Sequence, residues 1–227
     1  SGLLQGAYNE GKELDLYADF PAERIVKRDK DGNWCKWTGS AYASLITGLN
    51  GTVYCMAEGP DGKIYVGGKF TDAGGVAAAD YLARWNPTSE AWEAVGSTGK
   101  PASAVTALLF TPEGDLIVGG TLYVKRYTLS TGSPSAWTDE SSGSNFAITF
   151  VKNFVISPSG LIYAVGFFTN TAGTKNYGMA YSVYPQSSLV WSNIPWSEMS
   201  NSEQFDAITL APNGSIVVGG KFTDLDG

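Results

Sequence analysis

Histidine is absent from this chain of 227 residues, and charged residues make up only 16% of it. Without histidine, the chain has no Ser-His-Asp triad, no Cys-His pair and no histidine-ligated metal. The net charge is -7, and an acidic surface repels phosphate backbones, so we expect no nucleic-acid partner. No apolar run approaches the roughly 20 residues that a membrane-spanning helix needs, so we also expect no membrane insertion.

Cysteine is scarce as well, since the chain has only Cys35 and Cys55. Their spacing requires no disulfide, and Cys55 lies in an apolar run, where we expect it to pack as a small buried thiol. The chain is rich in glycine (28 residues), tyrosine (12) and tryptophan (7). This composition favours sheets joined by short turns, and 227 residues suffice for one large all-β domain.

A short pattern of a proline, one other residue and a glycine occurs four times. The turn glycines are Gly62, Gly114, Gly160 and Gly214, at spacings of 52, 46 and 54 residues. Six residues after each turn glycine comes a second glycine, at Gly68, Gly120, Gly166 and Gly220. Another glycine precedes it in three copies, and Val165 takes that place in the third. A repeat of this length in a strand-rich sequence predicts a solenoid or a propeller.

Each copy predicts a sheet of four strands. Apolar runs flank the Pro-x-Gly turn and predict two buried strands in a hairpin, with the glycine supplying a positive φ. The second glycine predicts a bulge or a close approach of backbones at the end of the second strand. Two further strands follow, as in 81–85 and 91–95, each containing a tryptophan or tyrosine. A four-stranded sheet repeated at about this period is a propeller blade.

The glycine pair Gly67-Gly68, followed by Trp85 and by Trp92 seven residues later, resembles a kelch repeat. The string 66–75 also resembles the glycine-rich propeller repeats of phage tail-fibre proteins and bacterial surface proteins. The resemblance covers about residues 25–227, with departures in the second and third copies. It implies a β-propeller, and it implies a place on a virion or a cell surface.

The expected fold is an all-β propeller of four-stranded antiparallel blades, with about four blade equivalents in residues 24–227. The blade units are 53–98, 105–140, 151–196 and 205–227, and we expect the last to be completed by the strands of 24–40. Such closure would remove exposed sheet edges. The alternative is that the chain is a fragment of a larger propeller. Residues 1–23 lie outside the repeat and are expected to form an N-terminal arm.

Candidate binding residues are those that the repeat does not explain. Trp196 and Tyr177 are expected in loops, and Tyr8 is expected in the arm. The aromatic rings of these residues could stack on a sugar. Asp72 and Asp224 follow the glycine pairs and could bind a ligand or act as paired carboxylates with Asp226. The alternative for these aspartates is a turn-forming role.

The repeated tryptophans are expected to pack between sheets. They are Trp85, Trp92, Trp137 and Trp191. A calcium loop at 29–34 lacks the distal carboxylate that it would need, so a plain hairpin turn is expected there. We predict no catalytic residue, no metal and no cofactor.

The leading hypothesis is a non-enzymatic binding or structural propeller module of a phage tail fibre or related virion appendage, which attaches to a host surface. Its partners would be a cell-surface glycan or protein, other virion proteins and further copies of the chain in a homo-oligomer. The second hypothesis is a kelch-like protein- or glycan-interaction module of a secreted or cell-surface bacterial protein. The third is a glycan-active enzyme on a propeller scaffold. The expected location is a virion, the extracellular space or a cell surface.

Overall fold

A computed structural model describes most of the chain as antiparallel strands joined by turns. The described residues are 5–9, 13–17, 26–28, 34–37, 42–44, 48–96, 98–129, 137–141, 146–170, 172–194, 197–199 and 203–222. Within these ranges no helix has the length and apolar character needed to cross a bilayer.

Three consecutive sheets have the predicted blade topology, in which each strand pairs with the next along the chain. The first blade contains β6 (Thr52–Glu58), β7 (Ile64–Lys69), β8 (Leu82–Asn86) and β9 (Ala91–Ala94). The second contains β10 (Val105–Phe110), β11 (Leu116–Gly120), β12 (Tyr123–Tyr127) and β13 (Trp137–Asp139). The third contains β14 (Phe146–Ile156), β15 (Leu161–Asn170), β16 (Asn176–Val183) and β17 (Ser192–Asn193), with β18 (Glu198–Met199) also paired to β16. A C-terminal hairpin of β19 (Gln204–Leu210) and β20 (Ile216–Lys221) follows.

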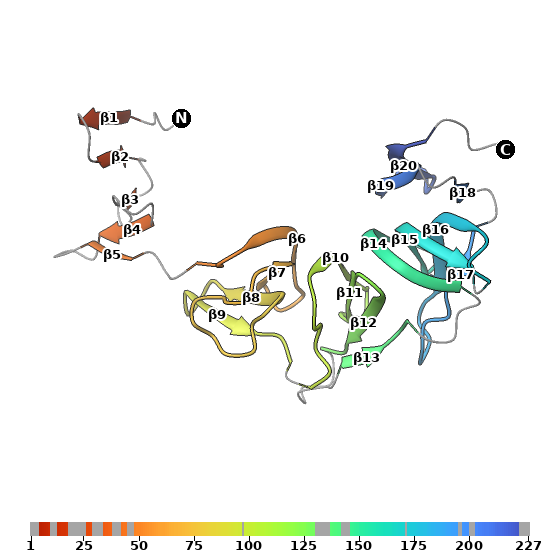
Figure 1. Cartoon of the computed structure of the whole chain (residues 1–227). Helices are drawn as coiled ribbons and strands as arrows, with labels where there is room; N and C mark the ends of the chain where they lie inside the picture. The colour runs from red at the N-terminus through yellow and green to blue at the C-terminus, as the bar shows by residue number, and fades with distance from the viewer. Residues whose placement is uncertain are drawn as a thin grey trace.

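The blades stand side by side in an open arc (Figure 1). The first strands β6, β10, β14 and β19 contact one another in this order and lie along the concave side of the arc. Apolar side chains fill the space between neighbouring sheets, as where the Tyr65 ring of the first blade meets the edge of Phe110 in the second at 4.9 Å. The concave row of first strands is therefore the wall of the propeller channel.

The turn glycines have the predicted conformation. Their φ angles are +70°, +92°, +83° and +82° at Gly62, Gly114, Gly160 and Gly214. This left-handed region carries a steric cost for side chains with a Cβ, so glycine is the favoured residue there. The local hairpins of all four copies follow directly from the sequence pattern.

The glycine pairs serve both of the predicted purposes. The second glycine of each pair lies opposite a bulge in the first strand, and a Cβ there would overlap a carbonyl oxygen of that strand. The first glycine faces the next blade: a Cβ on Gly67 would lie 2.6 Å from Val105, and one on Gly119 would lie 2.8 Å from Val151. Close approach between sheets therefore depends on the first glycine, and the bulge on the second.

Two of the repeated tryptophans connect neighbouring blades, as the packing hypothesis predicts. Trp137 is 7% exposed and donates its indole N–H to the carbonyl of Val95 at 3.1 Å. Trp191 is 1% exposed and donates in the same way to the carbonyl of Glu140 at 3.1 Å. Trp85 and Trp92 are half-buried and lie opposite each other on β8 and β9, with ring centroids 5.4 Å apart.

A buried ion pair adds a second connection between the second and third blades. Arg126 on β12 lies 2.8 Å from the carboxylate of Glu140, which is fully buried. The Arg126 guanidinium also donates to the carbonyl of Gln186, and Glu140 accepts the main-chain N–H of Leu189. The pair therefore holds the turn at 186–189, which belongs to the third blade, against the second.

The N-terminal part of the chain contains two groups of strands. Within residues 1–23, the segment expected to form an arm, β1 (Gln5–Asn9) and β2 (Glu13–Tyr17) form an antiparallel hairpin. A three-stranded sheet follows, made of β3 (Val26–Arg28), β4 (Trp34–Trp37) and β5 (Tyr42–Ser44). Strand β2 contacts β3, so the two groups of strands lie together.

The predicted joint sheet of 24–40 with 205–227 is not formed in this structure. Among the described residues, β20 pairs with β19 alone, and β3 and β4 belong to the N-terminal sheet. Strand β3 instead pairs with β4 and contacts β2. Figure 1 shows the N-terminal strands and the C-terminal hairpin at opposite ends of the arc.

Candidate pocket on the channel wall

The bulges place one residue from each of four successive units on the channel wall. These residues are Tyr54, Thr106, Lys152 and Asp206. Each stands eight residues before the turn glycine of its unit and is skipped in the pairing with the neighbouring strand. A bulge changes the direction of the side chain of the extra residue. The same backbone feature therefore directs a phenol, a hydroxyl, an ammonium and a carboxylate toward the channel.

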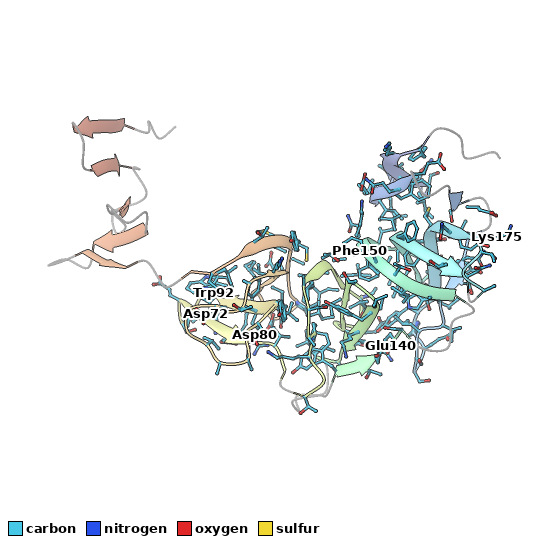
Figure 2. All side chains as sticks on the ribbon, in the orientation of Figure 1. Asp72, Asp80, Trp92, Glu140, Phe150 and Lys175 are labelled. Carbon is cyan, nitrogen blue, oxygen red and sulfur yellow. The ribbon has the colours of Figure 1, made fainter. Side chains whose placement is uncertain are left out.

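These four residues line a cavity of about 510 Å³ together with Ala104, Thr121 and Phe150. Ala104 precedes β10, and Thr121 follows β11 and forms a bridge with Phe150 of the next blade. Figure 2 shows Phe150 on the inner side of the arc, whereas Glu140 lies toward its outer side. The volume is within the range of pockets for small ligands, about 300–1,000 Å³.

The polar end of the pocket is an ion pair between two units. The Lys152 ammonium, on β14, pairs with the Asp206 carboxylate, on β19. Asp206 also accepts a hydrogen bond from the side chain of Gln204 at 3.5 Å, and 45% of its side chain is exposed. A donor and an acceptor thus stand next to each other, both accessible from the pocket.

The remainder of the lining is apolar or held in place by main-chain contacts. Tyr54 is 50% exposed on β6, at the end of the row of first strands farthest from β19. The Thr106 hydroxyl lies within hydrogen-bond distance of the carbonyls of Gly119, at 3.1 Å, and Val151, at 2.5 Å. Thr106 therefore connects the second and third blades below the pocket, and its orientation is fixed.

Tyr177 lies in a strand, so its predicted placement in a loop is wrong. It belongs to β16, pairs with Phe168 of β15, and is only 8% exposed within the hydrophobic core. Three further candidates, Trp196, Asp224 and Asp226, lie outside the described residues. Tyr8 lies on β1.

Asp72 is described, and it acts within its own turn. Its carboxylate oxygens accept the main-chain N–H of Gly75 at 3.1 and 3.2 Å, while its own N–H donates to the side chain of Asn50 at 2.9 Å. These contacts match the turn-forming alternative. Asp72 is not among the residues that line the pocket.

Cys55 lies beside the channel wall as a free, half-buried thiol. Burial raises the pKa of this thiol to about 12, although the backbone at Gly67 lowers it in part. Its sulfur lies 3.8 Å from the carbonyl of Val105 in the next blade. The residues that the structure describes contain no group of three or more histidine, cysteine or acidic residues able to hold a metal ion.

The pocket residues were missed by the sequence reasoning, but the aligned copies carry a signal for them. The position nine residues before the turn glycine is apolar in all four copies, and the following position changes from tyrosine to threonine, lysine and aspartate. A position that varies in chemistry directly after a position that is always apolar is typical of a side chain outside the core.

Comparison with known proteins supports the fold. A family model described as "Domain of unknown function (DUF5122) beta-propeller" matches residues 59–88, and no curated protein matches the chain. The extracellular domain of BT4673 from B. thetaiotaomicron is similar at 15% identity with a TM-score of 0.52, over 95% of this chain and 31% of that one. YCF48 from Cyanidioschyzon merolae is similar at 11% identity with a TM-score of 0.49, over 96% of this chain and 72% of that one.

The chain is therefore a β-propeller module, defined by its repeated four-stranded sheets, by the match of residues 59–88 to the propeller family model and by its similarity to the BT4673 domain. It spans about a third of the length of the BT4673 structure. The channel-wall pocket is the feature of this module to which a function can be attached.

Proposed function

We propose that this chain is a non-enzymatic binding module of an extracellular appendage, such as a phage tail fibre, and attaches to a host surface through the channel-wall pocket. The observation that carries the proposal is the pocket itself, in which four units present different chemical groups from one repeated framework. A rigid scaffold that holds varied side chains around a cavity suits recognition, because little conformational entropy is lost on binding.

The extracellular location rests on two further observations. The glycine-rich repeat resembles those of tail-fibre and bacterial surface propellers, and the part of BT4673 that shares the fold is its extracellular domain. Weak binding in such a module would gain from multivalency if several copies act together. A kelch-like interaction module on a bacterial surface would use the same pocket, with a protein as its partner.

Cell binding tests the proposal directly. The chain, fused to a fluorescent protein, is incubated with a panel of bacterial strains, and bound fluorescence is measured by flow cytometry. We expect one or more strains to bind the chain, and the Tyr54→Ala variant to lose most of that signal. Met56→Ala is the matched control, because Met56 lies on the same strand, is 68% exposed and does not line the pocket.

Pretreatment of the cells identifies the partner. Periodate destroys glycans and protease removes surface proteins, so the treatment that abolishes binding names the receptor class. Mass spectrometry of the bound glycan before and after incubation tests for turnover. Absence of binding to every strain, or equal binding by the two variants, would contradict the proposal, and turnover would contradict its non-enzymatic part.

A further inference from the structure

The charges of the pocket restrict the chemistry of its ligand. Among the described residues that line it, Lys152 and Asp206 alone are charged, and they neutralise each other as an ion pair. The whole chain carries a net charge of -7, which opposes the approach of an anion. A neutral ligand avoids both the separation of this pair and the repulsion by the acidic surface.

The ion pair also fixes the pattern of hydrogen bonds that the ligand must offer. The Lys152 ammonium only donates, and the Asp206 carboxylate only accepts. A hydroxyl both donates and accepts, so two neighbouring hydroxyls can bond to the two groups at once. Hydrogen bonds to charged groups are about twice as strong as those between neutral groups.

The opposite side of the pocket offers an apolar surface. Tyr54 lies on β6 at one end of the row of first strands, whereas Asp206 lies on β19 at the other. Phe150 stands between them on β14, beside Ala104. Aromatic rings with one accessible face bind ligands that are apolar on one side and polar at the edge. A sugar ring has this distribution, with C–H groups on a face and hydroxyls around the rim.

From these contacts we infer that the channel-wall pocket binds a neutral saccharide, with two neighbouring hydroxyls between Lys152 and Asp206 and the C–H face of a ring against Tyr54. This inference rests on the proposed function, and it names the ligand class of the same site. The pocket volume of about 510 Å³ is large enough for a small saccharide. The residues involved come from four units, so no single blade forms the site.

A glycan array printed with neutral and anionic oligosaccharides provides the first test, and calorimetry with the strongest neutral ligand provides the second. We expect binding to neutral glycans. Asp206→Asn should weaken the affinity by about tenfold or more, because it removes a charged acceptor. Tyr54→Ala should weaken it by about fivefold or more, while Tyr54→Phe, which keeps the ring, should stay within about twofold.

The matched control for Asp206→Asn is Glu198→Gln. Glu198 forms an exposed ion pair with Lys175, at 2.8 Å, that lies outside the pocket. This control should leave the affinity unchanged, and circular dichroism should show native folding for every variant. Affinity that survives Asp206→Asn and Tyr54→Ala, or binding restricted to anionic glycans, would overturn the inference.

The outcomes separate this inference from the proposed function. If the chain binds cells through Tyr54 but binds no neutral saccharide, the inference fails and the proposed function stands. If the chain binds neither cells nor glycans, both fail. If protease rather than periodate removes the cell receptor, the ligand is a protein and the saccharide inference is wrong.

Discussion

Replacement of Gly119 by alanine tests the packing of blades against one another. A Cβ at this position would lie 2.8 Å from Cβ and Cγ1 of Val151 and 2.8 Å from the Phe154 ring, all in the third blade. The φ of Gly119 lies outside the left-handed range, so the backbone itself accepts alanine. The cost must therefore come from the contact. Valine is β-branched and stiff at χ1, so Val151 cannot turn away easily.

The expected loss for Gly119→Ala is about 1–3 kcal/mol in the free energy of unfolding, the usual cost of overpacking a core by a small group. For a chain of this size, each kcal/mol lowers Tm by about 2–4 °C. Urea titration and thermal unfolding, both followed by circular dichroism, measure the change. The third unit has Val165 at the equivalent position. The size of the side chain that this position accepts therefore depends on the neighbouring strand.

The matched control is Gly219→Ala, at the equivalent position of the C-terminal hairpin. A Cβ on Gly219 would meet no atom within 4 Å, and its φ is also outside the left-handed range. Alanine restricts the unfolded chain more than glycine does, so this variant should gain about 0.4–1 kcal/mol. A Gly119→Ala variant as stable as the unsubstituted chain would refute the role assigned to Gly119. A loss at Gly219 as large as that at Gly119 would show that another element covers this hairpin.

Three further predictions concern charge and reactivity. Glu140→Gln leaves the buried Arg126 without its counter-charge and should lower the unfolding free energy by about 3 kcal/mol in urea titrations; a loss below about 1 kcal/mol would contradict a buried pair. Hydrogen bonds, the largest from Lys63, lower the pKa of Glu93 from 4.5 to about 2. The resulting stabilisation is complete above pH 4.5 and is lost as the pH falls through 2. The Tm of Glu93→Gln should therefore fall less steeply than that of the unsubstituted chain between about pH 5 and pH 2. An unchanged slope would refute this. The pKa of Cys55, about 12, predicts slow alkylation at pH 8 until the chain unfolds, and rapid labelling of the native peptide in mass spectrometry would contradict it.

The repeated strands and turns could be predicted because their causes are local. Pro-x-Gly turns between apolar runs specify a hairpin within about 20 residues, and the four turn glycines all adopt the left-handed conformation. The glycine pair indicated either a bulge or a close approach, and both occur. These features depend on one hairpin and its immediate neighbour, which the sequence spacing already defines.

Other features had no local signal or a misleading one. No Pro-x-Gly pattern lies between β1 and β2, so the repeat offered no basis for predicting that hairpin. In the third unit, β15 and β16 are longer than their counterparts in the first two blades. The additional length places Tyr177 in a strand opposite Phe168, where the repeat alone indicated a loop.

The pocket could not be predicted from one unit because its parts come from four. The preceding position in the same strands is constrained: Val105, Val151 and Phe205 are fully buried against the blade before them. The bulge residue that follows lies on the channel wall rather than in the apolar interface, so its side chain can change without altering the apolar packing between blades. The framework and the binding chemistry are thus carried by adjacent positions of one strand. A substitution at Tyr54 or Asp206 should therefore change the ligand, whereas a substitution one residue earlier in β10, β14 or β19 should change the stability of the arc.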